Sequence, residues 1–340
     1  MANILIIYTG GTIGMVKDKK SGVLLPLNFD HIKHNAPELE RMEHRLTVHS
    51  FNPIIDSSDM NPKIWVALAE LIEKNYHQYD GFVVLHGSDT MAFTTSALSF
   101  MLEGLAKPVV FTGSQLPIDE IRNDARENLI TAILIASEKF EETAVVPEVC
   151  IFFDYQLLRG NRATKYNSAK FEAFQSPNYP LLAEAGVHID FFSNAIAVPL
   201  DKPLKVHKDF DSSVAVLKLY PGISQKVVDA VLESDCKAII METYGSGNTT
   251  TELVFLDSLR RTIAQGKLIL DISQCRGGSV ELGRYETSIQ LKEMGVVSGY
   301  DMTFEAAVTK LMFLLGSGKP MDVVARLLEL NLRGELTENW

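Results

Sequence analysis

The chain opens with an apolar run that leads straight into a glycine-rich turn, NILIIYTGGTIG at residues 3–14. A second stretch, GFVVLHGSDT at residues 81–90, has the same plan and ends on hydroxyl and acidic side chains. Short apolar runs bounded by turns are consistent with buried strands of a parallel sheet. Because ligands bind outside the carboxyl ends of such strands, both turns are expected to face one crevice.

These two turns carry side chains suited to nucleophilic catalysis. Thr12 places a hydroxyl on the first turn, and Ser88 places a second hydroxyl beside the carboxylate of Asp89. A hydroxyl is a weak nucleophile at neutral pH unless a neighbouring group activates it. Ser88 or Asp89 could instead cap the helix that follows, because such side chains accept hydrogen bonds from the first free N–H groups of a helix.

A nucleotide-binding turn is the other interpretation of the first stretch. Its glycines do not have the G-x-G-x-x-G spacing, and no Lys-Ser/Thr pair follows to form a phosphate loop. Dinucleotide binding is therefore not favoured.

Strand and helix patterns alternate along the chain, which predicts an α/β protein built from parallel sheets flanked by helices. Pro203 and several charges interrupt the pattern in the stretch expected to be the linker. The predicted division is an N-terminal domain at 1–192, a linker at 193–213 and a C-terminal domain at 214–340. Predicted strands are 4–8, 82–86, 109–112, 149–154, 215–220, 238–243 and 268–272. One predicted helix begins at residue 62 after an Asn61 cap. Others span 91–102, 125–137, 304–315 and 323–330, and two more end at residues 232 and 264.

Composition narrows the class of protein. A length of 340 residues favours two domains, and a net charge of −11 argues against nucleic acid or an anionic membrane as partner. No apolar stretch is long enough to span a bilayer, and the first apolar run has no basic segment before it. The three cysteines and eight histidines show no disulfide or metal-ligand spacing. The expectation is a cytoplasmic protein without metal or cofactor.

Further motifs follow in a fixed order along the whole chain: DSSDM at 56–60, TGSQLP at 112–117, RGNRATK at 159–165, YGSGN at 244–248, QC at 274–275 and NLRGEL at 331–336. Together with the two turns they resemble the asparaginase family, in particular its bacterial cytoplasmic (type I) members. Each motif alone is weak, but their order and context are specific. The resemblance implies a larger N-terminal and a smaller C-terminal domain, a homodimer or homotetramer, and hydrolysis of L-asparagine to L-aspartate and ammonia.

The resemblance also implies roles for the residues of the two turns. Thr12 would be the nucleophile and would form an acyl-enzyme ester with the side-chain carbonyl of the substrate. Ser88, Asp89 and Lys165 would form a second catalytic set that relays protons. The competing interpretation of Lys165 is a solvated surface lysine, which is the commoner fate of lysine.

Substrate capture is expected to use charged and hydroxyl groups near the same turns. Asp89, next to Ser88, is the natural partner for the ammonium group of an α-amino acid. Asp56, Ser57 and Ser58 would hold its carboxylate. Asp59 is interpreted as turn punctuation before a helix.

Two positions depart from the family pattern. Ser88 stands where the family usually has threonine, which keeps the hydroxyl. The loop at 17–26 lacks the tyrosine that in the family helps to orient the nucleophile. Lys19 and Tyr8 are both candidates to replace it, and the sequence does not choose between them.

A second, allosteric site is conceivable near Ser273, Gln274 and Cys275, where some type I relatives bind asparagine. Those relatives carry an arginine where this chain has Glu242, which would repel the carboxylate of an effector unless Arg276 compensates. Allostery is therefore not expected.

Two other functions compete with asparagine hydrolysis. One is the amidase subunit of a tRNA-dependent amidotransferase, which resembles this family but has an extra N-terminal domain. Here the nucleophile turn begins at Thr9, which leaves no room for that domain. The other is a binding or sensing protein that kept the fold and lost turnover, for which the missing loop tyrosine is the support.

Overall fold

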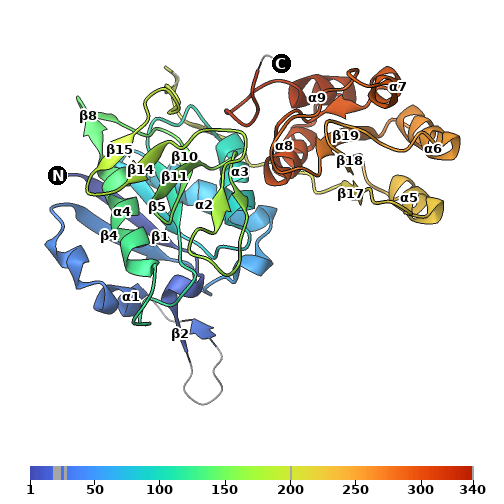
Figure 1. The fold of residues 1–340 in the computed structure, drawn as a ribbon. Helices are drawn as coiled ribbons and strands as arrows, with labels where there is room; N and C mark the ends of the chain where they lie inside the picture. Colours follow the sequence, from blue (N-terminus) through green and yellow to red (C-terminus); the bar gives the residue numbers. More distant parts are fainter. Residues whose placement is uncertain (18–23, 27–28, 200, 339–340) are drawn as a thin grey trace. The chain divides into compact units, whose positions relative to one another are not determined.

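The computed structural model describes residues 1–17, 24–26, 29–199 and 201–338. The chain divides into two compact units, Met1–Lys208 and Asp209–Trp340 (Figure 1). The junction between them falls inside the stretch 193–213, and the exact limits 1–192 and 214–340 stay a prediction.

The first unit is built on one eight-stranded sheet with the order β15-β14-β11-β10-β7-β5-β1-β4. Strands β4, β1, β5, β7 and β10 pair parallel with one another, whereas β11 pairs antiparallel with β10 and β14, and β14 pairs antiparallel with β15. Every residue of β5 is buried, as expected for a strand covered on both faces. The strands are β1 (Asn3–Tyr8), β4 (Arg45–Ser50), β5 (Gly81–Leu85), β7 (Val109–Thr112), β10 (Val149–Phe153), β11 (Gln156–Arg159), β14 (Ala183–Ala185) and β15 (Ile189–Phe191).

Helices cover both faces of this sheet. Ile6 of β1 belongs to the same buried cluster as Ile32 of α1 and Leu129 of α4, so α1 and α4 lie on one face. Phe82 of β5 stacks on Tyr76, which follows α2, so α2 lies on the other face. The helices are α1 (Phe29–Asn35), α2 (Pro62–Asn75), α3 (Met91–Met101) and α4 (Ala125–Ser137).

The start of α2 confirms the punctuation expected from the sequence. The Asn61 side chain accepts a hydrogen bond from the backbone N–H of Lys63 at 3.1 Å, and Pro62 occupies the first helical position. Proline suits that position because its missing N–H would have no partner inside the helix.

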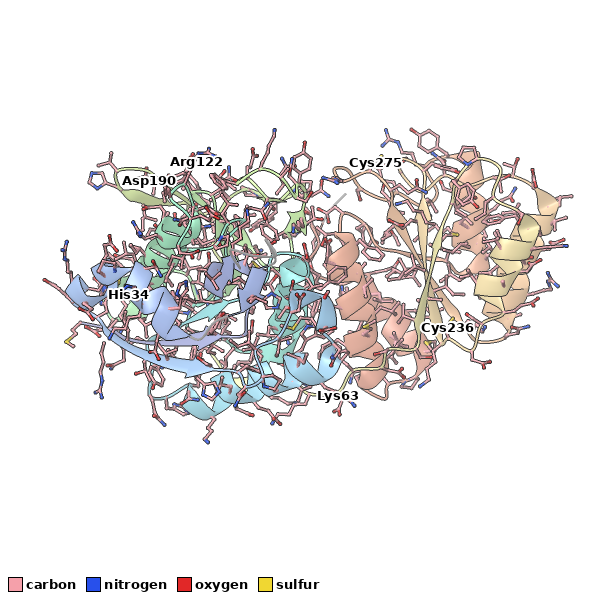
Figure 2. The ribbon with its side chains drawn as sticks, turned by 90° about the horizontal axis from the view of Figure 1, so that it is seen from below. His34, Lys63, Arg122, Asp190, Cys236 and Cys275 are labelled. Carbon is pink, nitrogen blue, oxygen red and sulfur yellow. The ribbon has the colours of Figure 1, made fainter. Side chains whose placement is uncertain are left out.

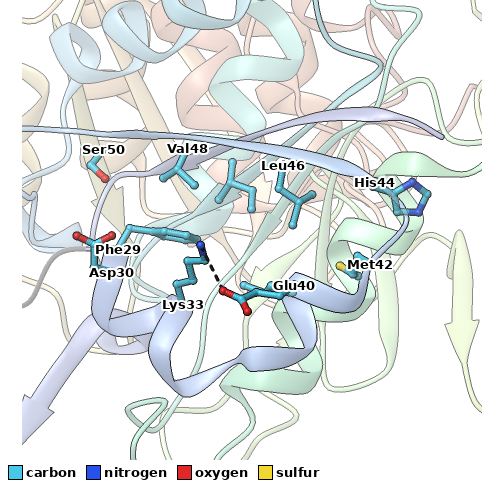
Figure 3. A pocket seen from close by; sticks show the side chains of 11 residues that line it. Phe29, Asp30, Lys33, Glu40, Met42, His44, Leu46, Val48 and Ser50 are labelled. Atoms are coloured by element: carbon cyan, nitrogen blue, oxygen red, sulfur yellow. Dashed lines mark ion pairs between the residues drawn. The ribbon is translucent and has the colours of Figure 1, made fainter.

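A cavity of about 510 Å³ lies beside the edge strand β4 (Figure 3). Its walls include Ile6 and Leu46 on the strands, and an ion pair between Lys33 and Glu40 spans 3.5 Å beside them. It forms because α1 and the short helical turn after it leave part of β4 uncovered. Among the described residues that line it, none belongs to the predicted catalytic or binding set.

The second unit contains a four-stranded sheet that is entirely parallel. Side chains of α5, α6 and α7 share one buried cluster on one face, whereas α8 packs on β17 and β18 and α9 on β20 (Figure 1). The α/β class with a larger first and smaller second unit is as predicted. The strands are β17 (Val214–Lys218), β18 (Ala238–Thr243), β19 (Leu268–Ser273) and β20 (Val297–Ser298). The helices are α5 (Gln225–Leu232), α6 (Leu253–Ala264), α7 (Glu286–Met294), α8 (Phe304–Gly316) and α9 (Met321–Leu328).

The motif NLRGEL has a structural role in the second unit. Glu335 forms an ion pair with Lys310 of α8 at 2.6 Å, and neither side chain has any exposed surface. The Lys310 ammonium also donates to the carbonyls of Leu328 and Leu330 at 2.8 and 2.6 Å. The Glu335 carboxylate also accepts hydrogen bonds from the backbone N–H groups of Leu332 and Arg333. These bonds tie the C-terminal segment to α8 and α9.

We predict that Lys310→Met lowers the free energy of unfolding by about 3–5 kcal/mol, because it leaves the Glu335 carboxylate buried without its countercharge. The matched control is Arg326→Met, which breaks the Arg326–Asp322 pair, whose side chains are 73% and 75% exposed. Exposed pairs contribute about 0–1 kcal/mol. Equilibrium urea unfolding measures both, and equal losses for the two variants would contradict a stabilising role for the buried pair.

Candidate active site

The structure brings the first and second turns into direct backbone contact. Strands β1 and β5 are neighbours, and Tyr8 pairs with Leu85 at their ends. Thr9 then donates two hydrogen bonds to the Leu85 carbonyl, from its N–H at 3.0 Å and from its hydroxyl at 2.8 Å. A Cβ atom on Gly11 would lie 2.6 Å from the nitrogen of Gly87. Only glycine allows this approach, and the φ of +96° at Gly11 favours glycine as well.

Thr12 is the first residue of a short 3₁₀ turn and is half-buried. The Tyr8 hydroxyl fills the space where a Cβ on Gly14 would be. Burial raises the pKa of Tyr8 to about 12, so this group stays a neutral phenol at physiological pH. The Tyr8 hydroxyl therefore lies next to Gly14, in the turn that carries Thr12. Lys19, the other candidate to replace the missing loop tyrosine, lies outside the described residues.

The predicted second set of catalytic residues comes together around one ammonium group. Lys165, on the two-residue strand β12 (Thr164–Lys165), donates to the Ser88 hydroxyl at 2.8 Å and to the Asp89 carboxylate at 2.5 Å. The Lys165 side chain is 17% exposed, against 70% for Asp89. The interpretation of Lys165 as a solvated surface lysine is therefore wrong.

Helix capping does not explain the second turn. The residue before α3 is Thr90, and its side chain makes no capping bond to the helix. Its hydroxyl donates instead to the carbonyl of Ser57 at 2.6 Å. The Asp89 carboxylate bonds to Lys165. Ser88 and Asp89 are thus placed by the turn after β5 and not by a capping role.

The segment with Asp56, Ser57 and Ser58 forms a third turn beside the other two. Ser57 is buried, and its hydroxyl lies where a Cβ on Gly87 would be. Asp56 accepts from the N–H and the hydroxyl of Ser58 at 2.9 and 2.8 Å, and these bonds lower the pKa of Asp56. The Asp56 carboxylate is thus the cap of its own turn, and Asp59 lies at the end of that turn, as expected.

A buried chain of hydrogen bonds, not foreseen from the sequence, holds the second turn from behind. The indole N–H of Trp65 lies 3.2 Å from the Thr94 hydroxyl, which lies 3.0 Å from Nε2 of His86, and Nδ1 of His86 lies 2.7 Å from the Gly87 carbonyl. A carbonyl only accepts, so Nδ1 carries the proton and Nε2 accepts from Thr94. The ring is fully buried and neutral, and burial lowers the pKa of His86 to about 4.

The residues of the conceivable allosteric site cluster at the carboxyl ends of β18 and β19. Glu242 forms an ion pair with Lys218 at 3.2 Å. Gln274 donates to the carbonyl of Glu242 at 2.8 Å, and Ser273 accepts from the N–H of Cys275 at 3.0 Å. Lys218 therefore already supplies a countercharge to the Glu242 carboxylate.

Cys275 is exposed at one end of the second unit's sheet, and Cys236 lies at the other end (Figure 2). Within the described residues, no group of three or more His, Cys, Asp or Glu side chains is arranged to hold a metal ion. No helix in the described part of the chain has the length and apolar character needed to cross a membrane.

We predict that the His86 ring titrates near pH 4 and stays neutral between pH 5 and 8. Its folded pKa lies below the ordinary value of about 6.5, so the unfolded chain binds more protons in this window. The contribution of His86 to stability is therefore complete above about pH 6.5 and is lost as the pH falls toward 4. NMR titration of the ring measures this, and a midpoint near 6.5 would contradict a buried, neutral His86.

Comparison with known proteins identifies the family of this chain. Residues 3–197 match the family model described as "Asparaginase, N-terminal", and residues 213–328 match the "Glutaminase/Asparaginase C-terminal domain". The chain is 42% identical over 336 residues to L-asparaginase 1 of Escherichia coli (strain K12), covering 98% of both. It is 42% identical to the 60 kDa lysophospholipase of Mus musculus, covering 98% of this chain and 62% of that protein. It is similar to the crystal structure of L-asparaginase I from Vibrio cholerae, with a TM-score of 0.90 and 40% identity over 99% of both chains. The chain belongs to the asparaginase family.

Proposed function

We propose that this protein hydrolyses the side-chain amide of L-asparagine to L-aspartate and ammonia. The observation that carries the proposal is that the Lys165 ammonium bonds to Ser88 and Asp89. The turn that carries Ser88 and Asp89 packs against the turn that carries Thr12. Full-length relatives at 40–42% identity that are named L-asparaginase support the choice of substrate.

In the proposed reaction, the Thr12 hydroxyl oxygen attacks the side-chain carbonyl carbon and loses its proton. The bond from that carbon to the amide nitrogen breaks, the nitrogen takes up a proton and ammonia leaves. The product is an ester between Thr12 and the aspartyl group. Water then attacks the ester, which releases L-aspartate and restores the hydroxyl. Ser88 and Lys165 form the relay that carries protons to and from the reacting atoms.

Substrate binding is assigned to groups of the second and third turns. The Asp89 carboxylate, which is largely exposed, pairs with the substrate ammonium. Ser57 and Ser58 hold the substrate carboxylate. Asp56 is itself negative and bonded to Ser58, so we assign it the orientation of Ser58 and not a direct contact with a carboxylate.

We further propose that the protein acts in the cytoplasm as a homodimer or homotetramer without a cofactor. This part of the proposal rests on the resemblance to type I asparaginases. Analytical ultracentrifugation of the purified protein measures the assembly state.

We predict that Thr12→Val abolishes ammonia release from L-asparagine and leaves the fold nearly intact, because valine keeps the shape of threonine and removes the attacking oxygen. The measurement is ammonia release by purified protein without tRNA, alongside the circular dichroism spectrum of each variant. A near-native kcat in Thr12→Val would refute the assignment of the nucleophile.

Ser88 is expected to act through its hydroxyl. Ser88→Thr keeps that group and should be tolerated, whereas Ser88→Ala should lower kcat by a factor of roughly 10² to 10⁴, the usual contribution of general acid–base assistance. Lys165→Met removes the other end of the relay and should be similarly severe. Steady-state kinetics decide, and equal rates for Ser88→Ala and the natural protein would exclude the relay.

We expect hyperbolic dependence of velocity on asparagine concentration, with a Hill coefficient of about 1, because Glu242 stands where effector-responsive relatives carry an arginine and an effector carboxylate therefore lacks that partner. An allosteric site typically couples by about 1–3 kcal/mol, which is enough for visible sigmoidality in an oligomer. Velocities from well below to well above half-saturation test this. A sigmoidal curve that becomes hyperbolic in Cys275→Ala would show that the second site works, and Arg276 would then be tested as its anchor.

A further inference from the structure

The loop that follows Lys165 is tied to a distant segment by two side chains. We call residues 166–173 the Lys165 loop and residues 113–124, which follow β7, the clamp segment. The Gln115 amide of the clamp segment donates to the carbonyl of Lys170 at 2.8 Å and lies 3.5 Å from that of Asn167. The Arg122 guanidinium lies over the ring of Phe171, 4.9 Å from its centre.

The backbone around Gln115 is itself firmly held. Asp124 is 8% exposed, and its carboxylate accepts from the N–H groups of Gln115 and Leu116 at 2.9 and 3.2 Å. The Asn128 amide, on α4, donates to the carbonyl of Gly113 at 3.0 Å. The Gln115 side chain therefore extends toward the Lys165 loop from a backbone segment that is bonded to α4.

The backbone next to Gln115 also contacts the turn that carries Ser88. Leu85 and Thr112 pair at the ends of β5 and β7, and the His86 N–H donates to the Thr112 carbonyl at 3.0 Å. A Cβ atom on Gly113 would overlap the His86 carbonyl oxygen. The clamp segment thus contacts the Ser88 turn through its backbone and the Lys165 loop through Gln115.

We infer that Gln115 is a positioning residue that keeps the Lys165 ammonium within bonding distance of Ser88 and Asp89. The inference rests on the proposed function. Lys165 has a flexible side chain on a two-residue strand, and the antiparallel partner of that strand is β13 (Phe174–Gln175), beyond the loop. Gln115 holds the middle of the loop at Lys170, so loss of this bond loosens the loop that joins the two strands.

The test is Gln115→Met, which keeps an unbranched side chain of similar length and removes the N–H donor. We expect kcat for asparagine to fall about 10- to 100-fold, the scale of a 1 Å misplacement of a catalytic group, with KM nearly unchanged. Amide hydrogen exchange in residues 166–173 should accelerate, whereas the melting temperature and exchange elsewhere should stay as in the natural protein. The matched control is Gln265→Met at the exposed end of α6, which should change none of these values.

A double-mutant comparison separates positioning from general damage. If Gln115 acts through Lys165, Gln115→Met adds no further loss of kcat to Lys165→Met, whereas independent effects would multiply. Arg122→Leu removes the second tie at the surface and should also accelerate exchange in the loop, which keeps the test valid if Gln115→Met fails to fold.

Each outcome decides one point. Unchanged kcat and unchanged loop exchange in Gln115→Met overturn the inference, and so does a multiplicative loss in the double variant. A natural protein that releases no ammonia from asparagine overturns the proposed function instead. Hydrogen exchange in Gln115→Met still reports in that case whether Gln115 holds the loop.

Discussion

The candidate site depends on how closely two backbone turns approach each other. A side chain on Gly11 would overlap Gly87, and one on Gly87 would overlap the Ser57 hydroxyl. Three turns from distant parts of the sequence therefore meet with almost no side chain between them. This contact requires β1 and β5 to be neighbours in a parallel sheet, because only then do both turns leave the same edge. The adjacency of β1 and β5 and the glycines at the contact therefore place the turn that carries Thr12 against the second turn.

Two buried ion pairs and one buried neutral ring show how some ionisable side chains of the described residues are accommodated away from water. Lys310 and Glu335 are fully buried and bonded to each other, and Arg159 and Glu148 form a second largely buried pair at 2.6 Å. His86 is buried beside the site as a neutral ring. Asp89, in contrast, is mostly exposed while bonded to Lys165. The site thus has a rigid neutral support behind it and a charged pair at its surface.

The sequence predicted those parts of the fold whose signal is local. Buried strands read as apolar runs, and the Asn61-Pro62 cap marks the start of α2, so these elements were placed within a residue or two. It did not reveal β4, whose residues are partly or fully exposed, or α7, whose side chains show weak apolar periodicity. Both exist because of what they pack against.

The candidate site likewise contains residues with a local sequence signal and residues without one. Thr12, Ser88 and Asp89 lie in turns that follow recognisable strands, whereas Lys165 was assigned from a motif and reaches Ser88 only through the fold. His86 and Gln115 were missed as supporting residues. Gln115 bonds to backbone carbonyls, and His86 bonds to one carbonyl and to the hydroxyl of Thr94 eight residues away. Such pairings arise from the fold and give no local signal in the sequence.

The chain from Trp65 to Gly87 runs in only one direction, because the indole N–H can only donate and the Gly87 carbonyl can only accept. Aligned hydrogen bonds polarise one another, each strengthening its neighbour. The last of them ends on the carbonyl oxygen of the peptide group that joins Gly87 to Ser88. Drawing electron density toward that oxygen leaves the nitrogen of the same group more positive. The N–H of Ser88 thereby becomes a stronger donor, so that a buried indole three hydrogen bonds away influences the backbone next to the Ser88 hydroxyl.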